Sequence, residues 1–245
     1  MSARPLSIIV PALREAAGIA ATLAALQPLR ARGAEVIVVD GGSDDGTAEL
    51  ARPLADRVLV AARGRARQMN AGAAVAGGCV LLFLHADTRL PEGADALIGA
   101  ALAPAGPEEA PARTGAHRRA RPRQPRWGRF DVRIEGRPRV LRVVAAMMNW
   151  RSRLTAIATG DQAIFVERAL FEAVGGYPDQ PLMEDIELSR RLRAHGAPAC
   201  LRARVVTSGR RWEQRGPWRT IFLMWRLRWR YWRGESAQAL AEAYR

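Results

Sequence analysis

The sequence contains no lysine, only two cysteines and no long run of apolar residues. Cys79 and Cys200 stand far apart in apolar surroundings without metal-ligand spacing, so neither a disulfide framework nor a zinc site is expected. The first residues, MSARPLSIIVPAL, lack the apolar core and cleavage site of a signal peptide. No run approaches the roughly 20 residues that a membrane-crossing helix needs. A cytoplasmic protein is therefore expected.

Two phosphate-binding motifs are also missing. The chain has no G-x-x-x-x-G-K-[ST] loop, and no G-x-G-x-x-G follows its first predicted strand. Phosphate held by a P-loop and a dinucleotide held by a Rossmann fingerprint are therefore not expected.

The formal net charge is +14, and arginine alone supplies the positive charge. Such a charge is typical of proteins that bind nucleic acid or anionic membranes. The arginines are clustered, however, with 21 of the 38 in residues 113–142 and 202–233. No RNA- or DNA-binding motif accompanies them, so no nucleic-acid partner is expected and a nucleic-acid-binding module is kept only as an alternative.

Strand-like and helix-like segments alternate along the chain. Short apolar runs predict buried strands at 6–10, 35–39, 57–61, 79–84, 127–134, 162–166 and 200–206. Helical patterns separate most of them, at 15–32, 65–76, 137–158 and 184–195. This alternation predicts an α/β fold with right-handed βαβ units, in which helices flank a mostly parallel sheet.

Residues 104–126 interrupt this pattern. They are rich in Pro, Ala, Gly and Arg without apolar periodicity, so we expect a mobile surface insertion. With 245 residues in all, the chain is expected to form one main domain over 1–206, insertion included, followed by a helical extension over 207–245.

Four acidic or polar clusters follow strand-like runs, at 11–15, 40–45, 85–87 and 184–185. Parallel-sheet topology would gather such strand ends at one edge of the sheet. Several carboxylates with few nucleophiles suit divalent-metal chemistry on a diphosphate. Taken alone, the cluster at 40–45 is explained by a capped turn, and the cluster at 184–185 by acidic charge at a helix N-terminus.

Five segments, in order along the chain, are similar to motifs of family 2 glycosyltransferases, which have the GT-A fold. SIIVPALREA resembles the opening strand, EVIVVDGGSDDGT the second-strand motif, and RARQMNAGAAVAGGCVLLFLHADTRLP the segment leading to the metal-binding D-x-D. ALFEAVGGYPDQPLMEDIELSRRLRAHG resembles the acceptor-side G-G-[FY] and E-D region, and SGRRWEQRG the R-W motif. The resemblance covers 6–216 apart from the insertion. Its G-D-Q at 160–162 and its R-R-W-E segment look most like a bacterial subgroup associated with arsenosugar biosynthesis.

The resemblance implies an inverting enzyme that moves a sugar from a nucleotide-diphospho-sugar, expected to be a UDP-sugar, to a hydroxyl acceptor. On the donor side it implies Pro11 and Glu15 as nucleotide-pocket residues, and Asp40 as the partner of the uracil base. Asp87 would bind Mg²⁺ or Mn²⁺ at the diphosphate. His85 replaces the first acid of the D-x-D, where an imidazole could bind the metal or a ribose hydroxyl.

Arg67 is a candidate for contact with phosphate or ribose, and an exposed helix face is its alternative explanation. On the acceptor side the resemblance implies Asp185 as the general base, with Glu184 as the alternative base. It also implies Arg211 and Trp212 at the diphosphate or the acceptor sugar. A carboxylate can take the hydroxyl proton, and a metal ion with an arginine can stabilise the leaving diphosphate. The acceptor would be a small molecule or a lipid-linked hydroxyl. The alternative enzyme class is a nucleotidyltransferase that uses a nucleoside triphosphate.

The last segment carries two apolar faces. Pro217 is well placed to begin a helix. At about 100° per residue one stripe contains Trp218, Phe222, Trp225, Trp229 and Trp232, and the opposite side contains Leu223, Met224, Leu227 and Tyr231. Arginines run along one flank. We expect this helix to dock on the anionic inner surface of a membrane. The alternatives are that a second helix over 236–244 covers the stripe, or that a homodimer contact does.

Overall fold

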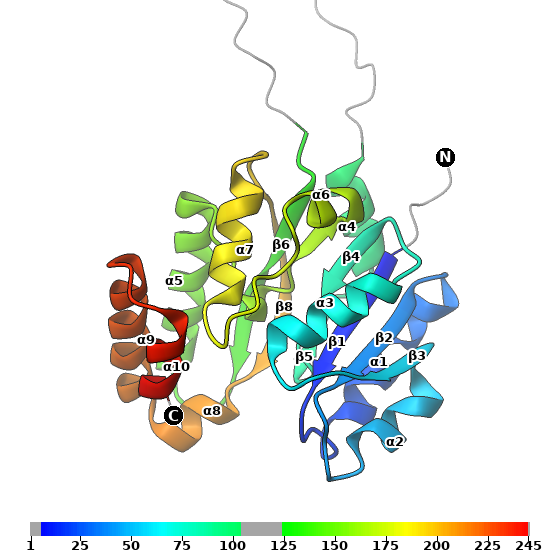
Figure 1. The fold of residues 1–245 in the computed structure, drawn as a ribbon, viewed down its shortest axis with the longest axis horizontal. Helices are drawn as coiled ribbons and strands as arrows, with labels where there is room; N and C mark the ends of the chain where they lie inside the picture. Colours follow the sequence, from blue (N-terminus) through cyan, green and yellow to red (C-terminus); the bar gives the residue numbers. More distant parts are fainter. Residues whose placement is uncertain (1–5, 104–123, 245) are drawn as a thin grey trace, which may run out of the picture.

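The computed structural model describes residues 6–103 and 124–244. Its strands form one sheet in the order β3-β2-β1-β4-β7-β6-β8-β5 (Figure 1). The strands are β1 (Leu6–Ala12), β2 (Glu35–Asp40), β3 (Arg57–Val60), β4 (Val80–Phe83), β5 (Thr88–Arg89), β6 (Trp127–Glu135), β7 (Phe165–Glu167) and β8 (Ala199–Ser208). Residues 104–123 of the predicted insertion lie outside the described residues, so its mobility stays a prediction.

The first half of the sheet is parallel. β1 pairs in parallel with β2 on one side and with β4 on the other, and β2 pairs in parallel with β3. β1, β2 and β4 are apolar on both faces, which is typical of strands that helices cover on two sides. The carboxyl ends of β1, β2 and β4 therefore meet at one edge, where the predicted polar clusters begin.

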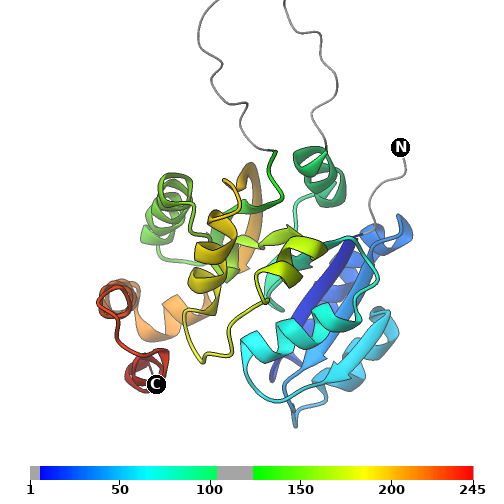
Figure 2. The ribbon, with the colours of Figure 1, turned by 45° about the horizontal axis from the view of Figure 1, so that its top comes forward.

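Helices cover both faces of the sheet (Figures 1 and 2). Successive side chains of a strand point to opposite faces, so Ile8 and Val10 pack in one core cluster and Ile9 in the other. The first cluster includes side chains of α1 (Ile19–Ala31), α2 (Thr47–Ala51), α4 (Ala94–Leu102) and α5 (Val140–Thr155). The second includes side chains of α3 (Arg65–Val75), α6 (Arg168–Ala173) and α7 (Glu184–Arg193). The predicted α/β fold, with helices flanking the sheet, is confirmed.

The second half of the sheet is mixed. β7 is antiparallel to β4 and β6, β6 is parallel to β8, and β5 is antiparallel to β8. The strand predicted from residue 162 is wrong at its start, because Gly160–Gln162 form a 3-10 turn, η2. Thr159 and Gln162 cap this turn reciprocally, and Ala163 leaves it with a left-handed φ of 47°. The chain becomes a strand only at Phe165.

Three helices follow the sheet: α8 (Arg210–Arg215), α9 (Pro217–Trp232) and α10 (Ala237–Tyr244). The predicted helix start at Pro217 is confirmed. α9 and α10 pack together and onto the N-terminal end of α7 through Met183, Leu227 and Leu240. Among the described residues no helix is both long and apolar enough to cross a membrane. The division between a domain over 1–206 and an extension over 207–245 stays a prediction.

Candidate active site

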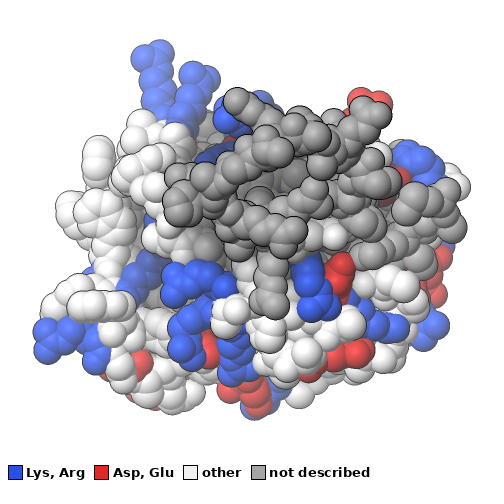
Figure 3. Space-filling view, turned by 90° about the horizontal axis from the view of Figure 1, so that it is seen from above, with Lys and Arg blue, Asp and Glu red and all other residues white. Residues whose placement is uncertain are grey.

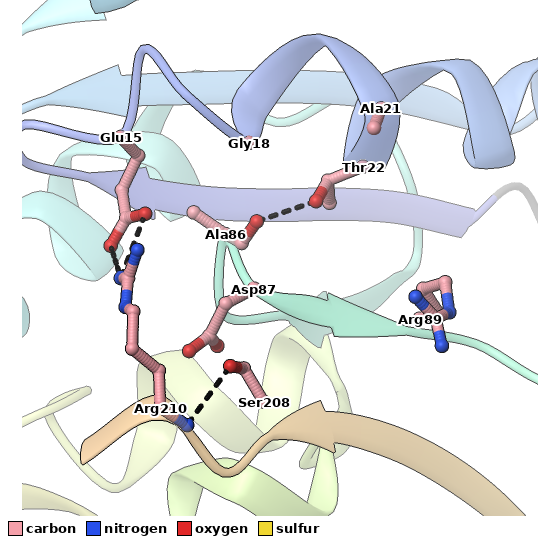
Figure 4. A pocket seen from close by; sticks show the side chains of 9 residues that line it. All are labelled: Glu15, Gly18, Ala21, Thr22, Ala86, Asp87, Arg89, Ser208 and Arg210. Carbon is pink, nitrogen blue, oxygen red and sulfur yellow. Dashed lines mark hydrogen bonds and ion pairs between the residues drawn. The ribbon is translucent and has the colours of Figure 1, made fainter. Parts of the chain in front are cut away.

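A pocket of about 240 Å³ opens where the loops after β1 and β4 approach the end of β8 (Figure 4). It is lined by Glu15, Gly18, Ala21, Thr22, Ala86, Asp87, Arg89, Ser208 and Arg210. Figure 4 shows the Asp87 carboxylate between the loop that carries Ala86 and the Ser208–Arg210 turn. Two of the donor-side residues predicted from sequence, Glu15 and Asp87, therefore lie in one pocket.

Arg210 reaches this pocket, although the sequence interpretation assigned its neighbour. One guanidinium nitrogen of Arg210 lies 3.4 Å from each carboxylate oxygen of Glu15. The Arg210 backbone N–H donates a hydrogen bond to the Ser208 hydroxyl at 3.2 Å. The guanidinium thus places a positive charge in the pocket that Asp87 lines, where a diphosphate could bind.

Arg211 and Trp212 are not among the residues that line this pocket. The Arg211 guanidinium donates to the Tyr244 hydroxyl, and its charge lies over the Tyr244 ring at 5.6 Å from the centroid. Trp212 is partly buried and packs against the core cluster that contains Phe130. Because α8 starts at Arg210 and each helical residue turns about 100°, three consecutive side chains cannot face one pocket. Their predicted contacts with diphosphate or sugar stay predictions.

His85 is engaged by a residue that the sequence interpretation gave no role. Its Nδ1 atom lies 3.2 Å from a carboxylate oxygen of Asp161 in η2. Its Nε2 atom is buried beside Gly160, without a hydrogen-bond partner among the described residues. A Cβ atom at Gly160 would lie only 2.4 Å from this Nε2, so the close packing requires glycine. Desolvation opposes the ionisation of Asp161, but the hydrogen bond and the charge of His85 lower the pKa of Asp161 below its ordinary value.

The same turn connects His85 to the acidic pair of α7. The Gly160 N–H donates to one Asp185 carboxylate oxygen at 2.9 Å, and the Ile186 N–H donates to the other at 2.8 Å. Two backbone donors therefore fix the orientation of the Asp185 carboxylate. Asp185 is half-buried, which leaves it accessible to an acceptor. The predicted clusters at 85–87 and 184–185 thus come together through η2.

Glu184 has a different environment. Its side chain is only 5% exposed, and one carboxylate oxygen lies 3.3 Å from the Arg65 guanidinium at the start of α3. Burial and the charge of Asp185 raise the pKa of Glu184, and Arg65 offsets part of this effect. Glu184 is therefore held as a buried, structurally paired group, whereas Asp185 beside it is more exposed.

The raised pKa of Glu184 predicts a pH-dependent stability. A carboxyl group with a higher pKa in the folded state than in the unfolded state destabilises the fold once it is ionised. This loss of stability develops as the pH rises from the pKa of the unfolded state through the pKa of the folded state. We expect Glu184→Gln to melt at a higher temperature than wild type at about pH 7.5, with little difference at about pH 4, since Glu184 is then largely protonated. Thermal melts at both pH values check this.

Glu187 on the same helix provides the matched control. Hydrogen bonds from Arg190 and Arg191 hold its pKa below the ordinary value, against desolvation. Its carboxylate therefore stabilises the fold above its unfolded pKa, and this contribution disappears as the pH falls through the folded value. Glu187→Gln should accordingly lower the melting temperature at about pH 7.5. A shift of both variants in the same direction would contradict the assignment.

The loop after β2 fixes the loop after β1. Asp40 is 2% exposed, and its carboxylate accepts hydrogen bonds from the N–H groups of Gly42 and Ser43 at 3.0 and 2.7 Å. The Thr47 hydroxyl accepts from the Glu15 N–H at 2.9 Å. Asp40 thus shapes its own loop, in agreement with the capped-turn explanation, and its contact with a base stays a prediction.

Pro11 and Arg67 are not among the residues that line the pocket. Pro11 sits in β1 opposite Val39 of β2. Arg67 forms an exposed ion pair with Asp179 at 2.8 Å, which agrees with the alternative of an exposed helix face. Their predicted contacts with the nucleotide stay predictions. Gln68 is a buried residue that the sequence interpretation missed. Its side-chain amide donates to the carbonyl oxygens of Ala12 near the end of β1, at 2.7 Å, and of Val39 near the end of β2, at 2.8 Å.

Asp87 has few protein partners for a metal ion. Within 6–103 and 124–244, no three His, Cys, Asp or Glu side chains cluster as a metal-binding group. Glu15 is paired with Arg210, and both nitrogens of His85 face Asp161 and Gly160. An Mg²⁺ or Mn²⁺ ion is compatible with this donor set when the diphosphate of a bound substrate supplies further oxygen ligands. The residue that would hold it is Asp87.

Residues 7–101, from β1 to α4, match the model of a family described as Glycosyl transferase family 2. A comparison with curated proteins finds no match for the chain.

Several solved structures share the fold. A mannosyltransferase from Pyrobaculum calidifontis, in complex with GDP-Man and Mn²⁺, is 22% identical, with a TM-score of 0.60 over 93% of this chain and 61% of that one. S. aureus TarS in complex with UDP is 17% identical, with a TM-score of 0.59 over 83% of this chain and 60% of that one. Glucosyl-3-phosphoglycerate synthase from Mycobacterium tuberculosis, in complex with Mn²⁺, UDP and glucosyl-3-phosphoglycerate, is 20% identical. Its TM-score is 0.52 over 82% of this chain and 70% of that one.

The chain spans about three-fifths of the length of the mannosyltransferase. It has the GT-A fold, and its residues 7–101 carry the sequence signature of glycosyl transferase family 2.

Proposed function

We propose that this protein is an inverting glycosyltransferase that moves a sugar from a nucleotide-diphospho-sugar to a hydroxyl acceptor. The observation that carries the proposal is the arrangement of the charged side chains. Asp87 and Arg210 lie in one pocket, and Asp185 is connected through η2 to His85, which stands two residues before Asp87. Sugar transfer from a diphosphate requires positive charge beside the leaving diphosphate and a carboxylate beside the attacking hydroxyl of the acceptor.

In the proposed reaction the acceptor hydroxyl attacks the anomeric carbon, and the bond from that carbon to the diphosphate oxygen breaks. The Asp185 carboxylate takes the hydroxyl proton, and its orientation is fixed by the Gly160 and Ile186 N–H groups. Arg210 stabilises the charge on the departing diphosphate after exchanging Glu15 for phosphate oxygens. Attack opposite the leaving group inverts the anomeric centre. A bound Mg²⁺ or Mn²⁺, held by Asp87, would neutralise diphosphate charge.

The donor base is proposed to be uracil. The S. aureus and M. tuberculosis structures contain UDP, whereas the P. calidifontis structure contains GDP-Man. The acceptor is proposed to be a small molecule or a lipid-linked hydroxyl. The narrower resemblance to the arsenosugar-associated subgroup stays a prediction. We further propose that the protein works in the cytoplasm at the inner face of the membrane.

Thermal-shift titration tests the donor class. We expect UDP with Mn²⁺ at about 100 times its dissociation constant to raise the melting temperature by on the order of 5–10 °C. A chelator should remove most of this shift. Parallel titrations with GDP, UTP and GTP separate the alternatives, because a nucleotidyltransferase should bind a triphosphate with preference. Equal, small shifts with all four nucleotides would refute the proposal.

A further inference from the structure

Exposed hydrophobic side chains are concentrated on two helices. Within the described part of the chain, Leu50 and Val60 are the exposed large hydrophobic residues outside α5 and α9. The other nine lie on those two helices. A monomeric protein rarely gathers so much exposed apolar surface without a partner for it.

On α9 the aromatic stripe predicted from sequence is exposed along its whole length. Trp218, Phe222, Trp225, Trp229 and Trp232 are 57–79% exposed. The opposite face of the helix is covered, since Leu227 is fully buried and packs with Leu240 of α10 and with Met183. The alternative in which the last helix covers the stripe is therefore wrong, because α10 packs on the other face.

α5 presents a second stripe, which the sequence interpretation did not identify. Its buried residues, Leu141, Ala145, Asn149 and Ser152, face the body of the protein. The opposite side carries Val143, Met147, Trp150 and Leu154, which are 49–65% exposed. Their spacing of four, three and four residues places them on one face of the helix.

Both helices lie on the same side of the molecule. Figures 1 and 2 show α5 and α9 on the side of the sheet away from β3, with α9 outermost. The view from above shows uncharged side chains along this side, with arginines close to them (Figure 3). Arg219, Arg226 and Arg233 follow one flank of the α9 stripe, and the Arg233 guanidinium lies 5.2 Å from the centre of the Trp229 ring. Arg230 lies on the same flank but is ion-paired with Glu235.

We propose that α5 and α9 together form a docking face for an anionic lipid bilayer. Trp side chains partition into the interface between headgroups and acyl chains, and flanking arginines bind acidic headgroups. The same arginines disfavour a second copy packed with its α9 helix antiparallel, because such a twofold contact brings the identical flanks together and like charges repel. This docking is independent of the sugar-transfer reaction, so either proposal can fail without the other.

Flotation with vesicles tests the docking face. The vesicles contain either phosphatidylcholine alone or phosphatidylcholine with a third of anionic phosphatidylglycerol. We expect the wild-type protein to float with the anionic vesicles at low salt and to bind the neutral vesicles at least tenfold more weakly. Raising the salt should weaken binding to the anionic vesicles, because it screens the arginines.

Three variants separate the two helices from general surface effects. Trp225→Ser combined with Trp229→Ser should reduce binding to anionic vesicles on the order of tenfold or more, since each side chain loses a large apolar area. Trp150→Ser on α5 should reduce it severalfold. Val60→Ser, at an exposed hydrophobic residue on β3, is the matched control and should leave binding unchanged.

Three outcomes would overturn the proposal in whole or in part. Wild-type protein that stays in the soluble fraction with both vesicles would show that this face does not dock on lipid. A stable dimer by light scattering that the α9 double variant dissociates, together with absent flotation, would assign the face to a second copy. If Trp150→Ser binds anionic vesicles as well as wild type while the α9 double variant binds them more weakly, α5 does not belong to the docking face. UDP binding in solution, measured on every variant, reports folding and donor binding separately.

Discussion

Asp87→Ala is expected to lower kcat/KM on the order of 10³-fold or more and to remove Mn²⁺-dependent binding of UDP. Two carboxylates line the pocket, those of Glu15 and Asp87. Arg210 is paired with Glu15, so the charge of Asp87 is not neutralised by this arginine. The other acid among the described residues that line the pocket, Glu15, is paired with Arg210 and is not free to replace Asp87 in holding a divalent cation at the diphosphate. Steady-state kinetics and calorimetric titration of UDP with and without Mn²⁺ measure both effects.

The control for this experiment is Asp95→Ala. Asp95 pairs with Arg32 at 2.7 Å and joins α4 to the end of α1, outside the residues that line the pocket. A partly exposed ion pair of this kind contributes little to stability, so activity should change by less than about twofold. Full activity of Asp87→Ala, or of the wild-type enzyme in excess chelator, would remove the divalent ion from the mechanism.

Asp185→Asn is expected to lower kcat by a factor on the order of 10² or more, with little change in UDP affinity. Asparagine preserves the shape of the side chain, and its carbonyl can still accept from the Gly160 N–H. It cannot take a proton from the acceptor, so the loss should fall on kcat.

Two neighbouring acids make this test specific. Glu184→Gln should reduce kcat much less, because its carboxylate is buried against Arg65. Asp161→Asn should have an intermediate effect, since Asp161 orients His85 and its replacement loosens the turn that holds Asp185. If Asp185→Asn is mild while Glu184→Gln or Asp161→Asn removes activity, the base is one of the other two carboxylates.

Most of the fold could be predicted because its strands are short apolar runs that end in polar loops. Predicted boundaries of β1, β2, β3 and β4 agree with the structure within two residues. The failure at β7 is informative: Gln162 lies next to an apolar run, but its side chain caps η2 and delays the strand. A local side-chain hydrogen bond decided the structure there, and periodicity does not report such bonds.

The site was harder to predict, because it depends on where side chains point at the ends of elements. Arg210, Arg211 and Trp212 are consecutive, and the sequence alone does not show which of them faces the pocket. In the sequence Asp161 stands out only as part of the G-D-Q segment, and its pairing with His85 requires the sheet to bring η2 beside β4. By contrast, the α5 stripe could have been found from the spacing of Val143, Met147, Trp150 and Leu154 alone.

The packing of His85 against Gly160 has an evolutionary consequence. Because a Cβ atom at position 160 would collide with the imidazole, a side chain can appear there only after His85 has been replaced by a smaller residue. Positions 85 and 160 are therefore expected to vary together among descendants of this sequence, although they lie 75 positions apart. A chain with aspartate at position 85 is free to carry alanine at position 160. A chain that keeps histidine at position 85 is expected to keep glycine at position 160, so the histidine should be replaced first when both positions change.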